Sequence, residues 1–122
     1  KDTYVRPHKH LSKGESIHVV EGALELITFD DVGNITGVTP MGDYSSGRAF
    51  FHRMTVSNYH TLLISSDYLV FHETANGPFK RSDTVFPYWA PDQPDGPETM
   101  DFMEQLAKTV QVFVSREKSG TA

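Results

Sequence analysis

Residues 6–26 read RPHKHLSKGESIHVVEGALEL and combine metal-binding side chains with the beginning of a β-structure. Polar and apolar side chains alternate on both sides of Gly22, as they do in half-buried strands. The apolar positions change parity at this glycine: Ile17 and Val19 precede it, and Leu24 and Leu26 follow it. Because successive strand side chains point to opposite faces, the change predicts a tight turn or bend at residues 21–22.

The rest of the chain predicts further short strands separated by turns. The strands are expected over residues 4–10, 15–20, 49–56, 59–64 and 67–74, with strong turn signals at residues 30–34 and 76–78. Residues 57–58 suit a short hairpin turn between the strands that flank them. Pro7 restricts the first strand to a sheet edge or a strand end. Such closely spaced strands indicate an all-β sandwich or barrel.

The last third of the chain has a different pattern. Residues 87–97 are rich in proline and predict a loop. A helical stripe of apolar residues then predicts a helix from about residue 98 to 115 that covers one outer face of the β-structure. Thr99 is the expected helix cap, and the acidic residues near it suit the positive end of the helix dipole. The stripe consists of Met100, Met103, Leu106, Ala107, Val110, Phe113 and Val114.

Length and composition restrict the class of protein. A chain of 122 residues has room for one domain, and a net charge of -5 argues against nucleic acid or an anionic membrane as the main partner. There is no cysteine, so a metal must be held by nitrogen and oxygen. The absence of a long apolar run or a signal-peptide pattern predicts a soluble, cytoplasmic protein. Because the chain opens on Lys1, it is compatible with a fragment whose own start is missing.

A metal site is the strongest functional signal in the sequence. Side chains two positions apart on a strand point the same way, so His8 and His10 can reach one ion, and Glu15 follows after a short loop. Imidazoles and a carboxylate without sulfur suit iron(II), manganese, nickel, cobalt or zinc. A His-x-His pair alone is more often a chance feature of a surface loop. The added Glu15 and Gly22 make the pattern more specific.

This spacing of His8, His10, Glu15 and Gly22 resembles the first motif of the cupins, which are small β-barrels. Their second motif supplies one further histidine on a later strand, and His60 fits that place. The chain departs from that second motif before and after the histidine. Thr55 and Ser57 stand where cupins usually have proline and glycine, and Ile64 stands where they have asparagine.

Several segments together are similar to the WbuC-type cupin fold metalloproteins over residues 4–92. They are Arg6-Pro7-His8-Lys9-His10, residues 21–33, Tyr59-His60-Thr61-Leu62, Glu73 and Gly77-Pro78-Phe79. The resemblance implies an antiparallel jelly-roll cupin barrel over residues 1–92. Residues 93–122 lie outside the resemblance and are expected, from their own pattern, to form a proline-rich loop and a helix packed on the barrel. The resemblance also implies one divalent ion (Zn, Fe, Mn or Ni) on His8, His10, Glu15 and His60, and genes commonly found beside those for bacterial surface polysaccharides.

Further residues are expected around the ion. The resemblance favours Glu73 as an inward-facing residue, with ion pairing to Arg81 or Lys80 as the alternative. If the protein is an enzyme, we expect Glu73 to act as a general base near the ion. Arg6 lies two positions before His8, so we expect it in the cavity, bound to Glu73 or to an anionic ligand. Tyr59 is the second expected substrate-binding residue. Of the other histidines, we interpret His18 as structural or solvent-facing and His52 as a core or interface residue.

Three functions are compatible with these residues. The first is a metal-dependent isomerase, epimerase or dioxygenase that acts on a small anionic or sugar-derived molecule. The second is a metal-dependent ligand-binding or sensing domain without turnover. The third is a metal-free sugar-nucleotide epimerase with a histidine base and Tyr59 or Tyr68 as acid. A homodimer is expected as well, because the edge of the first strand needs a cover.

Overall fold

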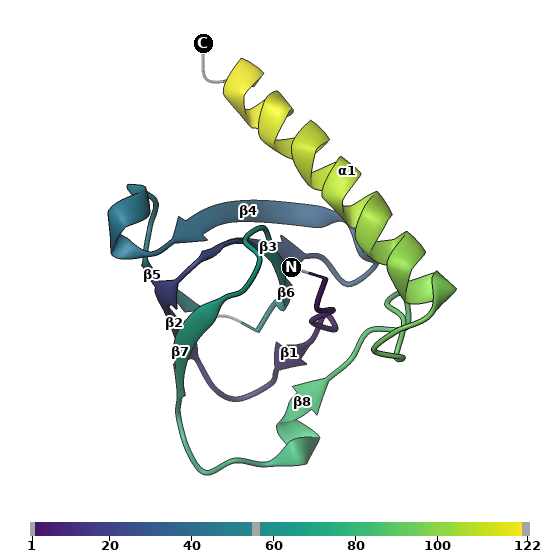
Figure 1. The fold of residues 1–122 in the computed structure, drawn as a ribbon. Coiled ribbons are helices and arrows are strands. Elements are labelled where there is room, and N and C mark those ends of the chain that lie inside the picture. Colours follow the sequence, from purple (N-terminus) through teal and green to yellow (C-terminus); the bar gives the residue numbers. More distant parts are fainter. Residues whose placement is uncertain (1, 55–56, 121–122) are drawn as a thin grey trace.

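The computed structural model describes residues 2–54 and 57–120 of the chain (Figure 1). Strands make up most of its elements, and a long helix follows them. In chain order the elements are β1 (Lys9–His10), β2 (Glu15–Glu21), β3 (Ala23–Phe29), β4 (Ile35–Gly42), η1 (Tyr44–Ser46), β5 (Phe51–Met54), β6 (Tyr59–Ile64), β7 (Val70–Ala75), η2 (Arg81–Asp83), β8 (Thr84–Val85) and α1 (Pro97–Gly120).

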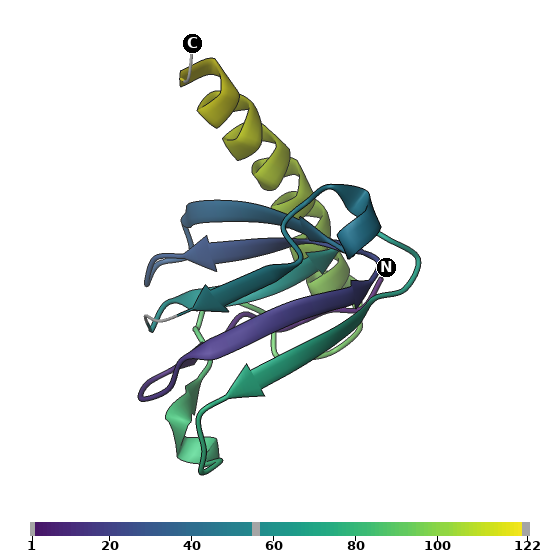
Figure 2. The ribbon, with the colours of Figure 1, turned by 90° about the vertical axis from the view of Figure 1, so that its left-hand side faces the viewer.

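Two three-stranded antiparallel sheets form the body of the molecule (Figures 1 and 2). Their strand orders are β5-β2-β7 and β4-β3-β6, and β1 pairs with β8 in a third, two-stranded sheet. The mostly antiparallel β-fold with a C-terminal helix is therefore confirmed. Over the described ranges, however, the strand pairing leaves these sheets separate and does not close them into a barrel.

Gly22 carries the chain from one large sheet to the other. β2 and β3 are consecutive in sequence but pair in different sheets, and Gly22 lies between them at a φ of 103°. A positive φ of this size is readily adopted only by glycine. The predicted bend at residues 21–22 is confirmed, and the change of parity at Gly22 reflects the change of sheet.

Apolar side chains from both sheets fill the space between them. The inner face of β2 contributes Ile17 and Val19, which are each 1% exposed, and β3 contributes Leu24 and Leu26. Met41 and Leu62 complete this cluster. The same face of β2 begins with Glu15, so the apolar filling gives way to polar side chains at one end of the interior.

The helix covers the other face of the β4-β3-β6 sheet. Ile27 and Phe29 of β3 point away from the interior and pack with Leu106 and Val110 of α1. The helix runs from Pro97 to Gly120, beyond the predicted residues 98–115, and its far end projects past β4 (Figure 1). No helix in the described part of the chain combines the length and apolar character needed to cross a membrane.

Two predicted details of the helix are wrong. Thr99 lies inside the first turn and is buried, and its hydroxyl donates a hydrogen bond to the Gln93 carbonyl at 2.8 Å, so it is not the cap. Proline is favoured in the first turn of a helix, and Pro97 starts this one ahead of Thr99. Met100 is 69% exposed and does not belong to the packed stripe, where Phe102 contributes instead.

The hairpin expected at residues 57–58 is not formed. β5 pairs with β2, whereas β6 pairs with β3, so the connection between them crosses from one sheet to the other. The strand expected over residues 49–56 is described as β5 from Phe51 to Met54, and residues 55–56 lie outside the described ranges.

The first strand is shorter than the sequence predicts. β1 holds only Lys9 and His10, and residues 4–7 form no strand in the structure. β1 pairs antiparallel with β8, so the edge that was expected to need a second subunit has a partner within the chain. The argument from an uncovered strand edge therefore no longer supports a homodimer, and the homodimer stays a prediction.

Replacing Gly22 by alanine tests the sheet-crossing bend. A Cβ at this position would lie 2.6 Å from both Ser66 Oγ and the Tyr68 carbonyl oxygen, whereas a Cβ at Gly47 would meet nothing within 4 Å. Both residues have positive φ, so each alanine costs about 1–2 kcal/mol of backbone strain. We expect Gly22→Ala to lose a further ~1–3 kcal/mol through overlap. Urea unfolding measures the difference, and equal losses would contradict the assignment.

Candidate metal centre

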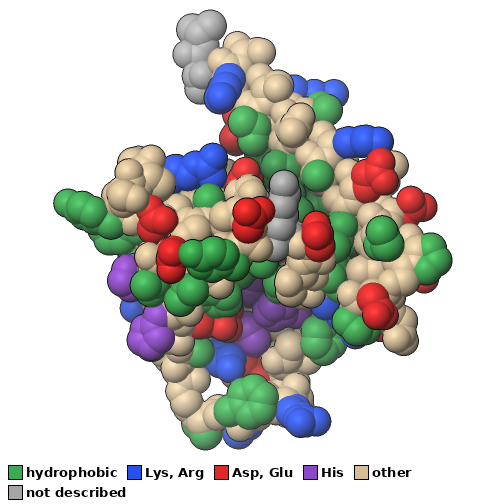
Figure 3. Space-filling model, viewed as in Figure 1, with side chains coloured by type: hydrophobic (Ala, Val, Ile, Leu, Met, Phe, Trp, Pro, Cys, Tyr) green, Lys and Arg blue, Asp and Glu red, His purple; other side chains and the backbone are tan. Residues whose placement is uncertain are grey.

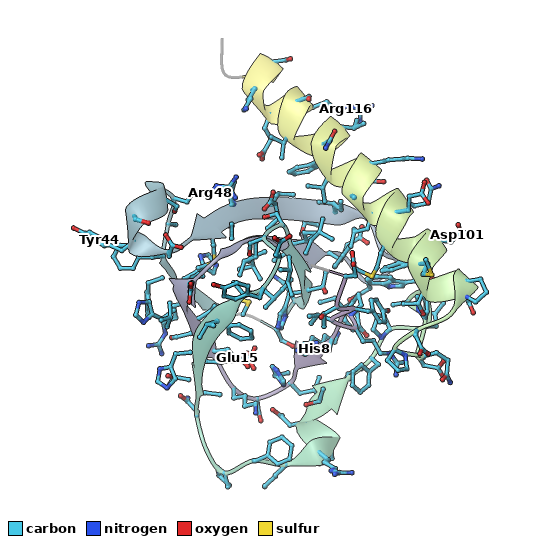
Figure 4. All side chains as sticks on the ribbon, in the orientation of Figure 1. His8, Glu15, Tyr44, Arg48, Asp101 and Arg116 are labelled. Atoms are coloured by element: carbon cyan, nitrogen blue, oxygen red, sulfur yellow. The ribbon has the colours of Figure 1, made fainter. Side chains whose placement is uncertain are left out.

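The side chains of His8, His10, Glu15 and His60 converge in the interior. One ligand atom from each lies within 4.8 Å of the others. Figure 4 labels two of these residues, His8 and Glu15, which lie near each other in the lower part of the molecule. Histidine and acidic side chains gather at the same place in the space-filling view, in the lower middle of the molecule (Figure 3). The residues predicted as metal ligands from the sequence are therefore brought together by the fold.

Backbone pairing places two of the histidines side by side. His8 and His60 form an isolated antiparallel bridge in which each N–H donates to the other's carbonyl, at 3.1 and 2.9 Å. Directly opposed residues in such a pair project their side chains to the same face. The two imidazole centroids are accordingly 4.6 Å apart, and that of His10 lies 5.2 Å from that of His8.

Glu15 lies at the centre of the cluster. Its Oε1 is 2.7 Å from His10 Nε2, and its Oε2 is 3.2 Å from His60 Nε2. Glu15, His10 and His60 are all buried. Despite these short distances, His10 Nε2 and Glu15 Oε2 make no well-directed hydrogen bond to another described protein group. A cation among these atoms would satisfy both, which is the observation that fits a metal to the site.

Each imidazole is oriented through its second nitrogen. Nδ1 of His8 is 2.8 Å from the Arg6 carbonyl oxygen, and Nδ1 of His60 is 3.0 Å from the Asn58 carbonyl oxygen. Nδ1 of His10 is 3.2 Å from the Thr84 hydroxyl. A carbonyl can only accept, so Nδ1 of His8 and of His60 carries the proton. Their Nε2 atoms are thereby left with free lone pairs, as metal-binding histidines require.

Electrostatics favour the metal-binding protonation states. Burial lowers the pKa of His8 and of His10, which keeps these imidazoles neutral at neutral pH. Burial alone would raise the pKa of Glu15, but the contact with His60 and the proximity of His10 outweigh it and lower that pKa. Neutral imidazoles around an ionised carboxylate are the donors that divalent ions such as zinc, iron(II), manganese and nickel accept.

A cavity of about 360 Å³ opens onto the cluster. Its lining is apolar apart from the metal-binding side chains and a few polar groups, among them Lys13 and Glu73. The other lining residues are Val5, Ile17, Thr61, Leu62, Phe71, Ala75 and Phe79. The four ligand side chains and this open side leave room for a small molecule to approach an ion directly.

Glu73 faces this cavity, as the sequence predicted, and its neighbour His72 lies on the opposite face of β7. Burial and the nearby charge of Glu15 raise the pKa of Glu73. Within the described ranges, Glu73 makes no ion pair with Lys80 or Arg81, the alternative that the sequence left open. The carboxyl group is thus placed beside Glu15 and the cluster.

Two predicted ligand-binding residues lie elsewhere. The Arg6 guanidinium is stacked over the Phe86 ring, 4.2 Å from its centroid, and Arg6 is not among the residues that line the cavity. Tyr59 is buried in the cluster under the helix, with the Lys9 ammonium 4.6 Å from its ring centroid. Arg6 had been expected in the cavity because it lies two positions before His8, but the strand begins only at Lys9 and the alternation does not extend back to Arg6.

Sequence reasoning missed Lys13 and Phe79 as lining residues. Lys13 precedes Glu15 by two positions, and that spacing is the signal that could have identified it. Its ammonium lies 5.2 Å from the centroid of the Phe79 ring. His18 is exposed, as expected for a residue on the outer face of β2. His52 is half-buried and lines a second cavity.

Comparison with known proteins gives one match. A family model described as a domain of unknown function (DUF6016) matches residues 1–41. This segment extends from the N-terminus into β4 and contains His8, His10 and Glu15. No curated protein and no solved structure matches the chain.

The metal site predicts one bound divalent ion per chain. Replacing His8 and His10 together by alanine should abolish binding, because it removes two donors and leaves too few to hold an ion. His18→Ala is the matched control, since His18 lies on β2 but faces solvent. Metal content by mass spectrometry of the purified proteins measures the effect. Retention of the ion by the double variant would refute the site.

Proposed function

We propose that the protein is a cupin-type metalloprotein that binds one divalent ion through His8, His10, Glu15 and His60 and acts on a small anionic or sugar-derived molecule. The observation that carries the proposal is the cluster itself. Donors from three separate segments, of which His8 is half-buried and the others are buried, converge within 4.8 Å, and the second nitrogen of each imidazole is already engaged. Such preorientation is characteristic of metal-binding histidines.

The charges around the first cavity favour an anionic ligand. A divalent ion held by neutral histidines and the carboxylate of Glu15 keeps a net positive charge. Lys13 adds one positive charge to the lining and an ionised Glu73 one negative charge, so the cavity with its ion stays net positive. Attraction to an anion is stronger in an enclosed site than in water. Carboxylate-bearing sugars and similar small anions are therefore the proposed ligand class, with Lys13 in the role that the sequence had suggested for Arg6.

The position of Glu73 in the cavity supports a reaction that proceeds by proton transfer. A bound divalent ion would polarise an oxygen of the ligand and so acidify a neighbouring C–H bond. Glu73 lines the same cavity and has no basic partner among the described ion pairs, so it can accept and return a proton. Isomerisation or epimerisation is the reaction class that these groups serve, in keeping with a sugar-derived substrate.

Replacing Lys13 tests the ligand class. We expect Lys13→Met to weaken binding of a sugar acid such as glucuronate by ~1–3 kcal/mol, the usual worth of a hydrogen bond to a charged group, and to leave metal content unchanged. Lys9→Met is the matched control, because Lys9 lies near Asp31 and the Tyr59 ring and is absent from the cavity lining. Calorimetry with glucuronate and with neutral glucose measures ligand binding by the wild-type protein and by both variants. Equal affinity for the two sugars would contradict the proposal.

Replacing Glu73 tests the reaction. With metal-loaded protein in D₂O, we expect exchange of a ligand C–H proton for deuterium, detected by NMR, and its loss by about 100-fold or more in Glu73→Gln. The isosteric amide cannot accept the proton but fills the same space. Binding of the sugar acid by calorimetry should remain. Binding without any exchange in the wild-type protein would assign the site to ligand sensing instead of catalysis.

A further inference from the structure

The inner face of β7 borders the first cavity without being buried. Its residues Phe71 and Glu73 are paired with Val19 and Ile17 of β2, so these four side chains lie on one face of the sheet. Val19 and Ile17 are each 1% exposed, whereas Phe71 is 38% exposed and every residue of β7 is exposed. The described chain therefore covers this face at β2 but leaves it open to the cavity at β7.

Phe79 adds a second exposed aromatic ring to the same cavity. It is 72% exposed and lines the cavity together with Phe71. A single exposed phenylalanine is common on protein surfaces, but two that line one cavity form an apolar surface that a ligand can cover. The remaining apolar lining residues are Val5, Ile17, Leu62 and Ala75.

Few polar groups are left for the body of a ligand. Apart from the metal-binding side chains, the polar residues of the described lining are Lys13, Thr61 and Glu73. The Thr61 hydroxyl already donates its hydrogen bond to the Val5 carbonyl. A sugar carries several hydroxyl groups, and each loses its hydrogen bonds to water when it is buried without a partner. A fully hydroxylated sugar would therefore be poorly matched to this lining.

Positive charge lies directly beside the apolar surface. The Lys13 ammonium is 5.2 Å from the centroid of the Phe79 ring, within the range of a cation–π contact. A carboxylate that pairs with Lys13 therefore brings its attached atoms next to this ring. The cavity thus combines an attraction for one anionic group with an apolar surface for the rest of the molecule.

We propose that the ligand of the first cavity is a small carboxylate with an apolar body, such as an alicyclic or aromatic ring. The inference rests on the proposed function and narrows its ligand class. The ion and Lys13 bind the carboxylate, and Phe71 and Phe79 cover the apolar body and so determine specificity. A volume of about 360 Å³ is near the lower end of the range for small-molecule sites and suits one ring with its carboxylate.

Calorimetry on the full chain loaded with zinc tests the ligand class with two acids. Cyclohexanecarboxylate and glucuronate have rings of similar size, but only glucuronate carries ring hydroxyl groups. We expect cyclohexanecarboxylate to bind about ten-fold more tightly or better, because it covers the apolar lining without burying unpaired hydroxyls. Cyclohexylmethanol keeps the ring but lacks the charge, so it should bind about ten-fold more weakly than cyclohexanecarboxylate.

Alanine variants test the two rings. Phe71→Ala and Phe79→Ala should each weaken the binding of cyclohexanecarboxylate by about five-fold and change the binding of glucuronate less. Because Phe79 is mostly exposed, Phe79→Ala is expected to fold normally. Phe51→Ala is the matched control and should change nothing. Phe51 is 55% exposed but is paired with His18 on the outer face of β2, outside the cavity lining.

The outcomes separate this inference from the proposed function. Tighter binding of cyclohexanecarboxylate that the phenylalanine variants weaken supports the inference. Tighter binding of glucuronate, or undiminished binding of cyclohexanecarboxylate by both variants, would overturn it and leave the proposed anion site in place. Failure of both acids to bind, or binding of cyclohexylmethanol as tight as that of cyclohexanecarboxylate, would overturn the inference and the proposed anion site together.

Discussion

The burial of the Glu15 carboxylate among three imidazoles is the constraint around which this structure is organised. A buried carboxylate costs several kcal/mol unless charge and hydrogen bonds offset the loss of water. Here the offset requires groups from three places: His10 on β1, His60 on β6 and the N-terminal segment that carries His8. The contacts that make the site chemically useful are therefore also those that hold the N-terminal segment against both sheets.

The interior is divided along the direction of β2. At one end Ile17 and Val19 belong to the apolar core, which stabilises the facing sheets without any directional bond. At the other end Glu15 begins the polar half, where two cavities meet at His60. Apolar packing thus provides the rigid support, and the polar half can keep open space and unpaired donors that a uniformly packed core would exclude.

The sequence predicted correctly those features that depend on the alternation of side chains along one strand or on the backbone conformation of a single glycine. The i, i+2 spacing of His8 and His10, the parity of Glu15 and the glycine at 22 all follow from properties of a single strand or turn, and the structure contains each of them. Arg6 was misplaced because the same alternation was extended through Pro7, before the strand begins. Alternation indicates which face of a strand a residue occupies, but it does not indicate which strand lies beside it. For that reason the connection between β5 and β6, which crosses between the sheets, was predicted as a hairpin.

His60 lines both cavities. Its backbone is fixed by the bridge to His8, its Nδ1 by the Asn58 carbonyl, and its Nε2 lies beside Glu15. The ring therefore has little freedom to move without disturbing either the cluster or the segment that borders the second cavity. Any ligand that shifts this ring changes metal affinity, and by linkage the metal changes the affinity for that ligand by the same factor. A ring held at three points shifts little, which keeps that factor small.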